Sequence, residues 1–123
     1  KNVETFPGRS EELGKNIKYR EQYDLCVSRA VANMSVLSEY CIPFVKKGGK
    51  FISYKSGNIE NEVENAGNSV YKLGGKLSEI VDFSLTDSTT GEKLGRSLVV
   101  IDKIKETPGK YPRRAGLPSR EPL

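Results

Sequence analysis

The feature that most constrains the fold is a change of hydrophobic period along the first part of the chain. Residues 23–28 (YDLCVS) form a continuous apolar run of strand length, typical of a parallel strand covered on both faces. The next apolar residues follow at spacings of 4, 3, 4 and 3, which places them on one face of an amphipathic helix ending at Pro43: Ala30, Met34, Leu37, Cys41 and Phe44. A strand that leads into such a helix predicts a βα unit.

The same alternation continues through the rest of the chain. Residues 46–50 (KKGGK) predict a turn and residues 51–55 (FISYK) the next strand. A second helix is indicated by apolar residues at helical spacing, and the glycine pair 74–75 stops it: Ile59, Val63, Ala66, Val70 and Leu73. Alternation over residues 77–85, a polar loop over 86–95 and an apolar run at 98–101 then predict two strands joined without a helix.

At the start, residues 2–6 are an extended candidate, followed by a helix or loop that Ser10 would cap. The predicted order is β, helix, β, helix, β, helix, β, β. This order is typical of an open, twisted α/β sheet with crossover helices and an antiparallel pair at its end. Ligands of such sheets bind beyond the carboxyl ends of the parallel strands. The residues expected there are Gly8, Arg9, Ser10, Glu11, Ser28, Arg29 and Lys55.

Residues 103–123 form a basic, proline-rich tail, which we expect to pack on a domain made of residues 1–102. The tail holds six of the 20 basic residues and two of the 16 acidic ones, so residues 1–102 keep fourteen of each sign and the net charge of +4 resides in the tail. Its four prolines favour an extended course, pinned at Ile104, Tyr111 and Leu117. Such a basic segment suits a phosphate backbone. The alternative is a solvated, disordered end.

Composition narrows the function further. A length of 123 residues suits a single domain. No apolar run approaches a membrane span, and the start resembles neither an initiator Met nor a secretory signal, so we expect a cytoplasmic chain that is cut from a longer one. Cys26 and Cys41 lie in apolar surroundings without metal-ligand spacing, which predicts reduced, packed thiols and no metal site. The absence of His argues against Ser/His and Cys/His nucleophilic catalysis.

Three stretches carry a family resemblance. They are GRSEELG near the start, DLCVSRAVANMSVLSEYCIPFVKKGGKFISYK in the middle and GRSLVVIDKIKETPGKYPRRAGLPSREPL at the end. They resemble the carboxyl-terminal portion of the bacterial 16S ribosomal RNA guanine-N7 methyltransferases, the glucose-inhibited division protein B (GidB) family. The resemblance implies a class I S-adenosylmethionine-dependent methyltransferase fold, Rossmann-like, that lacks its first strands. It also implies methylation of guanine N7 in 16S ribosomal RNA.

The resemblance also assigns cofactor residues. It carries over a position near the adenine of S-adenosylmethionine to Ser10 and Glu11, with Ser10 in place of the usual Ala, and the Arg of the SRA motif to Arg29. Without it, Glu11 reads as a solvated first-turn acid and Arg29 as a salt-bridge partner. The family's glycine-rich cofactor loop lies upstream of Lys1, and the pair Gly48-Gly49 cannot replace it because it follows a helix and precedes a strand. We therefore expect this chain to be inactive alone.

Transfer of a methyl group to N7 needs alignment and exclusion of water more than a general base, which is compatible with a chain that lacks His. The RNA-contact candidates are Lys55, Arg96, Lys110, Tyr111, Arg113 and Arg114. Lys55 can also be a solvated lysine, and Tyr111 can pin the tail instead. The expected partner is 16S ribosomal RNA or the small ribosomal subunit. The alternative function is a non-catalytic RNA-binding fragment, or one that self-associates through exposed sheet edges.

Overall fold

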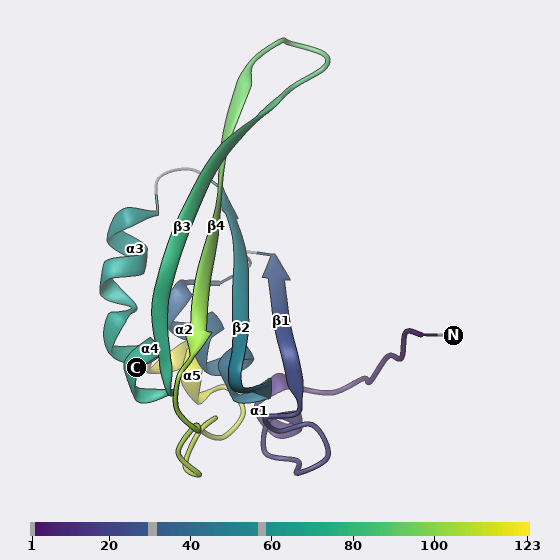
Figure 1. Cartoon of the computed structure of the whole chain (residues 1–123), viewed down its shortest axis with the longest axis vertical. Coiled ribbons are helices and arrows are strands. Elements are labelled where there is room, and N and C mark those ends of the chain that lie inside the picture. Colours follow the sequence, from purple (N-terminus) through teal and green to yellow (C-terminus); the bar gives the residue numbers. More distant parts are fainter. Residues whose placement is uncertain (1, 30–31, 57–58) are drawn as a thin grey trace.

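The computed structural model describes residues 2–29, 32–56 and 59–123 as a four-stranded sheet with short helices (Figure 1). Its elements are α1 (Ser10–Leu13), β1 (Tyr23–Arg29), α2 (Met34–Cys41), the 3-10 turn η1 (Ile42–Phe44), β2 (Val45–Ser56), α3 (Glu60–Asn65), α4 (Gly67–Lys72), β3 (Gly75–Thr86), β4 (Lys93–Lys103) and α5 (Leu117–Arg120). No helix in these ranges is long and apolar enough to cross a membrane.

The sheet has the strand order β1-β2-β4-β3. β1 runs parallel to β2, with Val27 opposite Ile52, and β4 runs antiparallel to both β2 and β3. The last strand of the sequence therefore inserts between β2 and β3 instead of adding to the edge. An α/β sheet with crossover helices and a final antiparallel pair is thus confirmed.

The core lies between one face of this sheet and the helices α2 and α4. Phe51 of β2 and Val99 of β4 are fully buried, and they belong to one cluster with Met34 of α2 and Leu73, which follows α4. Figure 1 is viewed from the opposite side, so the strands lie in front of α2 and α5. That front face has no helix over it among the described residues. Within the part of the chain that the structure describes, only one face of the sheet is therefore covered.

β1 differs most from expectation. The apolar run predicts a strand covered on both faces, but β1 is the edge of the sheet, and Leu25 and Val27 are 52% and 67% exposed. Only Cys26 and Ser28, which are partly buried, are shielded on this strand. The prediction is wrong because, among the described residues, the helices cover a single face and no further strand pairs with β1.

The predicted turn at residues 46–50 is instead a bulge inside β2. Tyr23 pairs with Val45 and Leu25 with Lys50, so a step of five residues in β2 lies opposite a step of two residues in β1. Gly48 makes this possible with a φ of 94°, a left-handed conformation that side chains disfavour. A Cβ on Gly49 would lie 2.5 Å from the carbonyl oxygen of Asp24. Turn chemistry is present, but the strand continues through it.

The two predicted helices are shorter than their periodicity suggests. α2 begins after Asn33, whose side chain accepts a hydrogen bond from the Ser35 N–H at 2.9 Å, and the predicted first position, Ala30, lies outside the described residues. The second helix divides at Ala66 into α3 and α4. It stops as predicted at Gly74, where φ is 92° and a Cβ would lie 2.4 Å from the Lys105 carbonyl oxygen.

Two predictions near the start are wrong. Residues 2–6 form no strand; they are exposed, and Phe6 packs against Tyr19 with ring centroids 4.8 Å apart. The N-cap of α1 is Arg9, without a side-chain cap hydrogen bond, so Ser10 is the first helical residue. A lone extended segment has no strand to share its backbone hydrogen bonds, which leaves it as a loop.

The strands β3 and β4 are longer than predicted. They pair from Gly75 opposite Lys103 to Thr86 opposite Lys93, so the connecting loop shrinks to residues 87–92. Figure 1 shows this hairpin rising beyond the rest of the molecule. Most residues of β3 are exposed, so the pattern of apolar residues does not predict the full length of the hairpin.

Candidate functional site

Glu11, a predicted cofactor residue, is buried on α1 with only 4% of its surface exposed. Its carboxylate accepts a hydrogen bond from the Gly116 N–H at 2.9 Å and forms a salt bridge with Arg9 at 3.1 Å. Burial by itself raises the pKa of Glu11, but the hydrogen bonds from Gly116, from its own N–H and from Arg9 outweigh it and lower the pKa below its ordinary value. In this chain Glu11 therefore binds the tail through the backbone N–H of Gly116.

Two further carboxylates hold the tail in the same way. Glu21 accepts a hydrogen bond from the Thr107 N–H at 2.8 Å, and the fully buried Glu39 accepts one from the Arg113 N–H at 2.7 Å. The Arg113 guanidinium also pairs with Glu39 at 2.9 Å. Hydrogen bonding to Glu39 raises the pKa of Arg113 above its ordinary value. These contacts pack the described tail against the rest of the protein.

Arg20 completes this attachment, and sequence reasoning missed it. Its guanidinium donates to four backbone carbonyl oxygens at 2.6–3.0 Å, those of Gly14, Thr107, Pro108 and Tyr111. An arginine fork suits several acceptors in one plane. No local signal marks Arg20, because three of its partners lie about ninety residues away in sequence.

Lys103 is buried at the end of β4 and faces Glu21. Its ammonium forms a salt bridge with Glu21 at 3.0 Å and donates to the Val45 carbonyl oxygen at 2.6 Å. Burial lowers the pKa of Lys103 although Glu21 opposes that shift. The first residue of the predicted tail thus belongs to the sheet.

The remaining tail candidates divide by exposure. Tyr111 is buried, so its placement supports the pinning role, and the Lys110 ammonium lies 5.3 Å from its ring centroid. Leu117 is half-buried at the start of α5, while Arg114 is exposed. Ile104 is 44% exposed and does not pin the tail, so that prediction is wrong. The tail also departs from a purely extended course at α5, where Gly116 has a φ of 86°.

Lys55 lies near the carboxyl end of β2, as expected, but it points into the protein. Its ammonium forms a salt bridge with Glu62 and donates to the Ala32 carbonyl oxygen at 2.7 Å. Glu62 in turn accepts a hydrogen bond from the Met34 N–H at 2.9 Å. Lys55 is 5% exposed, so neither a solvated lysine nor a free RNA contact describes its position here.

Arg29 and Arg96 are brought together on the open face of the sheet. They line one cavity of about 150 Å³ with Tyr54 and Ser56. Arg29 lies at the end of β1, whereas Ser10 and Glu11 lie on α1, and no described contact joins them. The structure therefore separates the three predicted cofactor residues and unites two arginines that the sequence assigns to different ligands.

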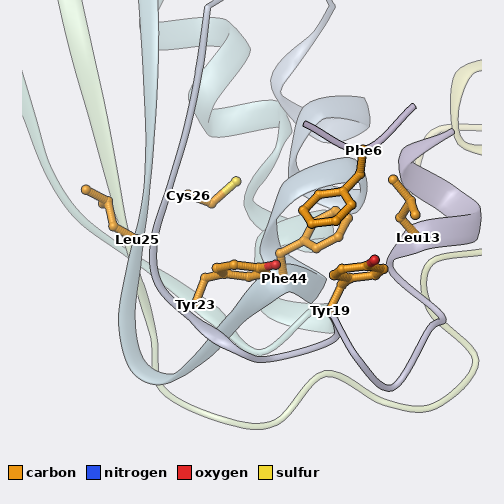
Figure 2. A pocket seen from close by; sticks show the side chains of 7 residues that line it. All are labelled: Phe6, Leu13, Tyr19, Tyr23, Leu25, Cys26 and Phe44. Carbon is orange, nitrogen blue, oxygen red and sulfur yellow. The ribbon is translucent and has the colours of Figure 1, made fainter. Parts of the chain in front are cut away.

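A second cavity, of about 240 Å³, lies beside β1 and was not predicted. Figure 2 shows the aromatic side chains around it, and its lining is almost wholly apolar: Phe6, Leu13, Tyr19, Tyr23, Leu25, Cys26 and Phe44. The rings of Tyr23 and Phe44 lie 6.5 Å apart. The individual aromatics are visible in the sequence, but only folding gathers them.

Cys26 and Cys41 are free thiols, as expected, with Cys41 buried and Cys26 partly so. A hydrogen bond between them lowers the pKa of Cys26, and the same bond together with burial raises that of Cys41. Cys26 lies in the middle of β1 and Cys41 at the end of α2, so this hydrogen bond joins the two elements.

Comparison with known proteins gives a consistent result. A family model described as rRNA small subunit methyltransferase G matches residues 1–90. The chain is 49% identical over 116 residues to the ribosomal RNA small subunit methyltransferase G of an Exiguobacterium species, covering 94% of this chain and 47% of that relative. The protein of the same name from Clostridium botulinum is 45% identical over 123 residues, which cover 100% of this chain and 50% of that relative. The chain thus spans about half the length of these curated relatives.

A solved structure shares the fold at low sequence identity. A putative methyltransferase from Thermoplasma acidophilum superposes with a TM-score of 0.57 at 11% identity, over 71% of this chain and 41% of that one. The mixed four-stranded sheet is therefore part of a Rossmann-like methyltransferase fold of class I, as expected.

Proposed function

Because the chain belongs to the rRNA small subunit methyltransferase G family, we propose that it is part of an enzyme that transfers a methyl group from S-adenosylmethionine to guanine N7 of 16S ribosomal RNA. The match of the family model to residues 1–90 carries this proposal. The parallel pair β1 and β2, with β4 inserted beside β2, supports it, because a solved structure with this arrangement of the fold is described as a putative methyltransferase. Ribosomal RNA within the small subunit is the proposed partner.

The described residues do not by themselves form a complete cofactor site. The Glu11 carboxylate is occupied by Arg9 and Gly116, and Arg29 lies elsewhere. S-adenosylmethionine supplies the methyl group when bound. For this chain we propose only that Ser10 and Glu11 border the cofactor in a protein of the relatives' full length. The 123-residue chain alone is then inactive.

Calorimetric titration of the 123-residue chain with S-adenosylmethionine, and with S-adenosylhomocysteine in parallel, tests this division. We expect no saturable heat, because the described cavity that Arg29 lines with Arg96 does not include Glu11, whose carboxylate already binds Arg9 and Gly116. Micromolar binding would overturn the expectation and show that these residues suffice.

The reaction itself is tested on a protein of the relatives' full length that contains this sequence. After incubation with 16S ribosomal RNA and S-adenosylmethionine, N7-methylguanosine is detected by borohydride reduction and aniline cleavage of the strand. Cleavage at one guanosine supports the proposal. Methyl incorporation without cleavage would place the methyl group on another atom.

A separate observation supports a second function, self-association without catalysis. β1 exposes an unpaired edge, and the sheet face beside it exposes Leu25 and Val27. Unpaired strand edges recruit other strands. We therefore retain a self-associating or RNA-binding fragment as the alternative for the chain by itself.

A further inference from the structure

The open face of the sheet ends in a small polar cavity between three neighbouring strands. Arg29 of β1 pairs with Tyr54 of β2, and Ser56 of β2 pairs with Arg96 of β4. Residues 54 and 56 lie two apart on one strand, so their side chains share a face. The four side chains line a cavity of about 150 Å³, which we call the two-arginine pocket.

The charges of this pocket are not neutralised from within. The Arg29 guanidinium lies 5.6 Å from the Tyr54 ring centroid, and Arg96 donates to the carbonyl oxygen of the adjacent Gly95 at 2.8 Å. Among the described residues, neither guanidinium forms a salt bridge, unlike Arg9 and Arg113. Two like charges that share one cavity repel each other. A bound anion with several oxygen acceptors relieves that repulsion.

An aromatic surface adjoins the two cations. The Tyr54 ring lies edge-on to Phe83, with centroids 6.2 Å apart, and Phe83 pairs with Arg96 across β3 and β4. A wider cavity of about 480 Å³ shares Arg29 and Tyr54 and has an apolar floor that includes Ile52. A simple anion uses only the guanidiniums. A nucleotide uses the cations for its phosphate and the ring for its base or sugar.

We propose that the two-arginine pocket binds a phosphodiester group of single-stranded RNA. Arg29 and Arg96 donate hydrogen bonds to the phosphate oxygens, and the Tyr54 ring contacts the neighbouring base. The inference rests on the proposed function, because the family acts on ribosomal RNA. It adds the place and the residues of the contact, and it moves Arg29 from the cofactor to the RNA.

The test measures binding of a labelled single-stranded oligoribonucleotide of about 12 nucleotides to the chain by fluorescence anisotropy over a series of salt concentrations. We expect Arg96→Ala and Arg29→Ala each to weaken binding about tenfold at low salt and to reduce the salt slope by about one. Tyr54→Leu weakens binding but leaves the salt slope unchanged, because it removes stacking and no charge. The matched control is Lys47→Ala, which removes one exposed charge near the start of β2.

Three results would overturn the proposal. One is no RNA binding by the unaltered chain, and another is equal losses in Arg96→Ala and Lys47→Ala, which would mean a diffuse electrostatic attraction. The third arises in a protein of the relatives' full length, if Arg29→Ala or Arg96→Ala abolishes S-adenosylmethionine binding but retains RNA affinity. The pocket would then hold the cofactor carboxylate. Urea midpoints equal to that of the unaltered chain confirm that each variant is folded.

The measurements of RNA affinity and of methyl transfer can refute the two proposals independently. If the unaltered protein of the relatives' full length binds RNA but forms no N7-methylguanosine, only the proposed function is contradicted. Normal methylation by Arg96→Ala with unchanged RNA affinity contradicts the two-arginine pocket alone.

Discussion

At the scale of single residues, the tail is held by carboxylates that face backbone N–H groups. Glu11, Glu21 and Glu39 each accept one such hydrogen bond from the tail, from Gly116, Thr107 and Arg113 respectively. Charge-assisted hydrogen bonds of this kind are stronger than neutral ones. One basic side chain of the tail also forms an ion pair with the rest of the protein instead of facing solvent. Arg113 illustrates this, because its guanidinium pairs with Glu39 and also donates to the Glu121 carbonyl oxygen at 2.6 Å.

Glu11 gives a prediction about pH. Its folded-state pKa lies below the ordinary value of 4.5, so the unfolded chain binds more protons as the pH falls. The stabilisation by Glu11 is complete above pH 4.5 and is lost as the pH drops through the lowered folded pKa. We expect Glu11→Gln to cost about 1 kcal/mol at pH 7 and nothing at low pH. Urea unfolding between these limits measures it.

The neighbouring Glu12→Gln is the control for that experiment, since Glu12 is exposed on the same helix. It should leave the free energy of unfolding within about 0.5 kcal/mol at every pH. A constant difference between Glu11→Gln and the unaltered chain, independent of pH, would contradict the role given to the Glu11 charge.

At the scale of the element, the bulge in β2 decides how β1 meets the sheet. A step of five residues in β2, from Val45 to Lys50, lies opposite a step of two residues in β1, from Tyr23 to Leu25, and the two strands regain regular parallel pairing only from Leu25 onward. Gly48 supplies the positive φ, and Gly49 allows the backbone of β1 to approach. Without the bulge, the register of Arg29 opposite Tyr54 would shift.

Two glycines of opposite surroundings test this account. A Cβ on Gly49 would meet backbone, 2.5 Å from the Asp24 oxygen, so Gly49→Ala should cost about 1–3 kcal/mol. A Cβ on Gly67, the first residue of α4, would have nothing within 4 Å, so Gly67→Ala should stabilise the protein by about 0.5–1 kcal/mol. Thermal or urea unfolding reports both. Equal effects of the two substitutions would contradict the close approach at Gly49.

In the molecule as a whole, the described residues cover one face of the sheet and leave the outer edge of β1 unpaired. Helices α2 and α4 pack behind it, and the front face exposes apolar side chains such as Val27. In a chain that spans about half the length of its relatives, such a surface is available to a second copy.

We therefore expect the 123-residue chain to self-associate at high concentration, as measured by light scattering. Val27→Lys places a charge on the edge strand and should raise the dissociation constant about tenfold. Ile17→Lys is the control, because Ile17 is 84% exposed in the loop before β1. A clean monomer of the unaltered chain at high concentration, or an equal effect of both substitutions, would contradict association through β1.

Much of the element order follows from the sequence by itself. The runs around Phe51 and Val99 are strands whose apolar side chains are buried in the core, and the repeat from Met34 to Cys41 is a helix that packs on the same core. The run around Val27 is also a strand, although Val27 itself is exposed. The glycine pair at residues 74–75 ends a helix as predicted. The family resemblance is also carried by local motifs, which need no tertiary structure to be read.

Which side chains meet follows from the three-dimensional arrangement of the strands and the tail. Arg20 binds tail carbonyl groups about ninety residues away, and Arg29 and Arg96 meet because β2 lies between their strands. Whether Lys55 faces water or Glu62 is equally invisible in local sequence. The physical reason is that hydrophobic period reports which face of an element is apolar, whereas partners depend on strand order and register, which long-range contacts determine.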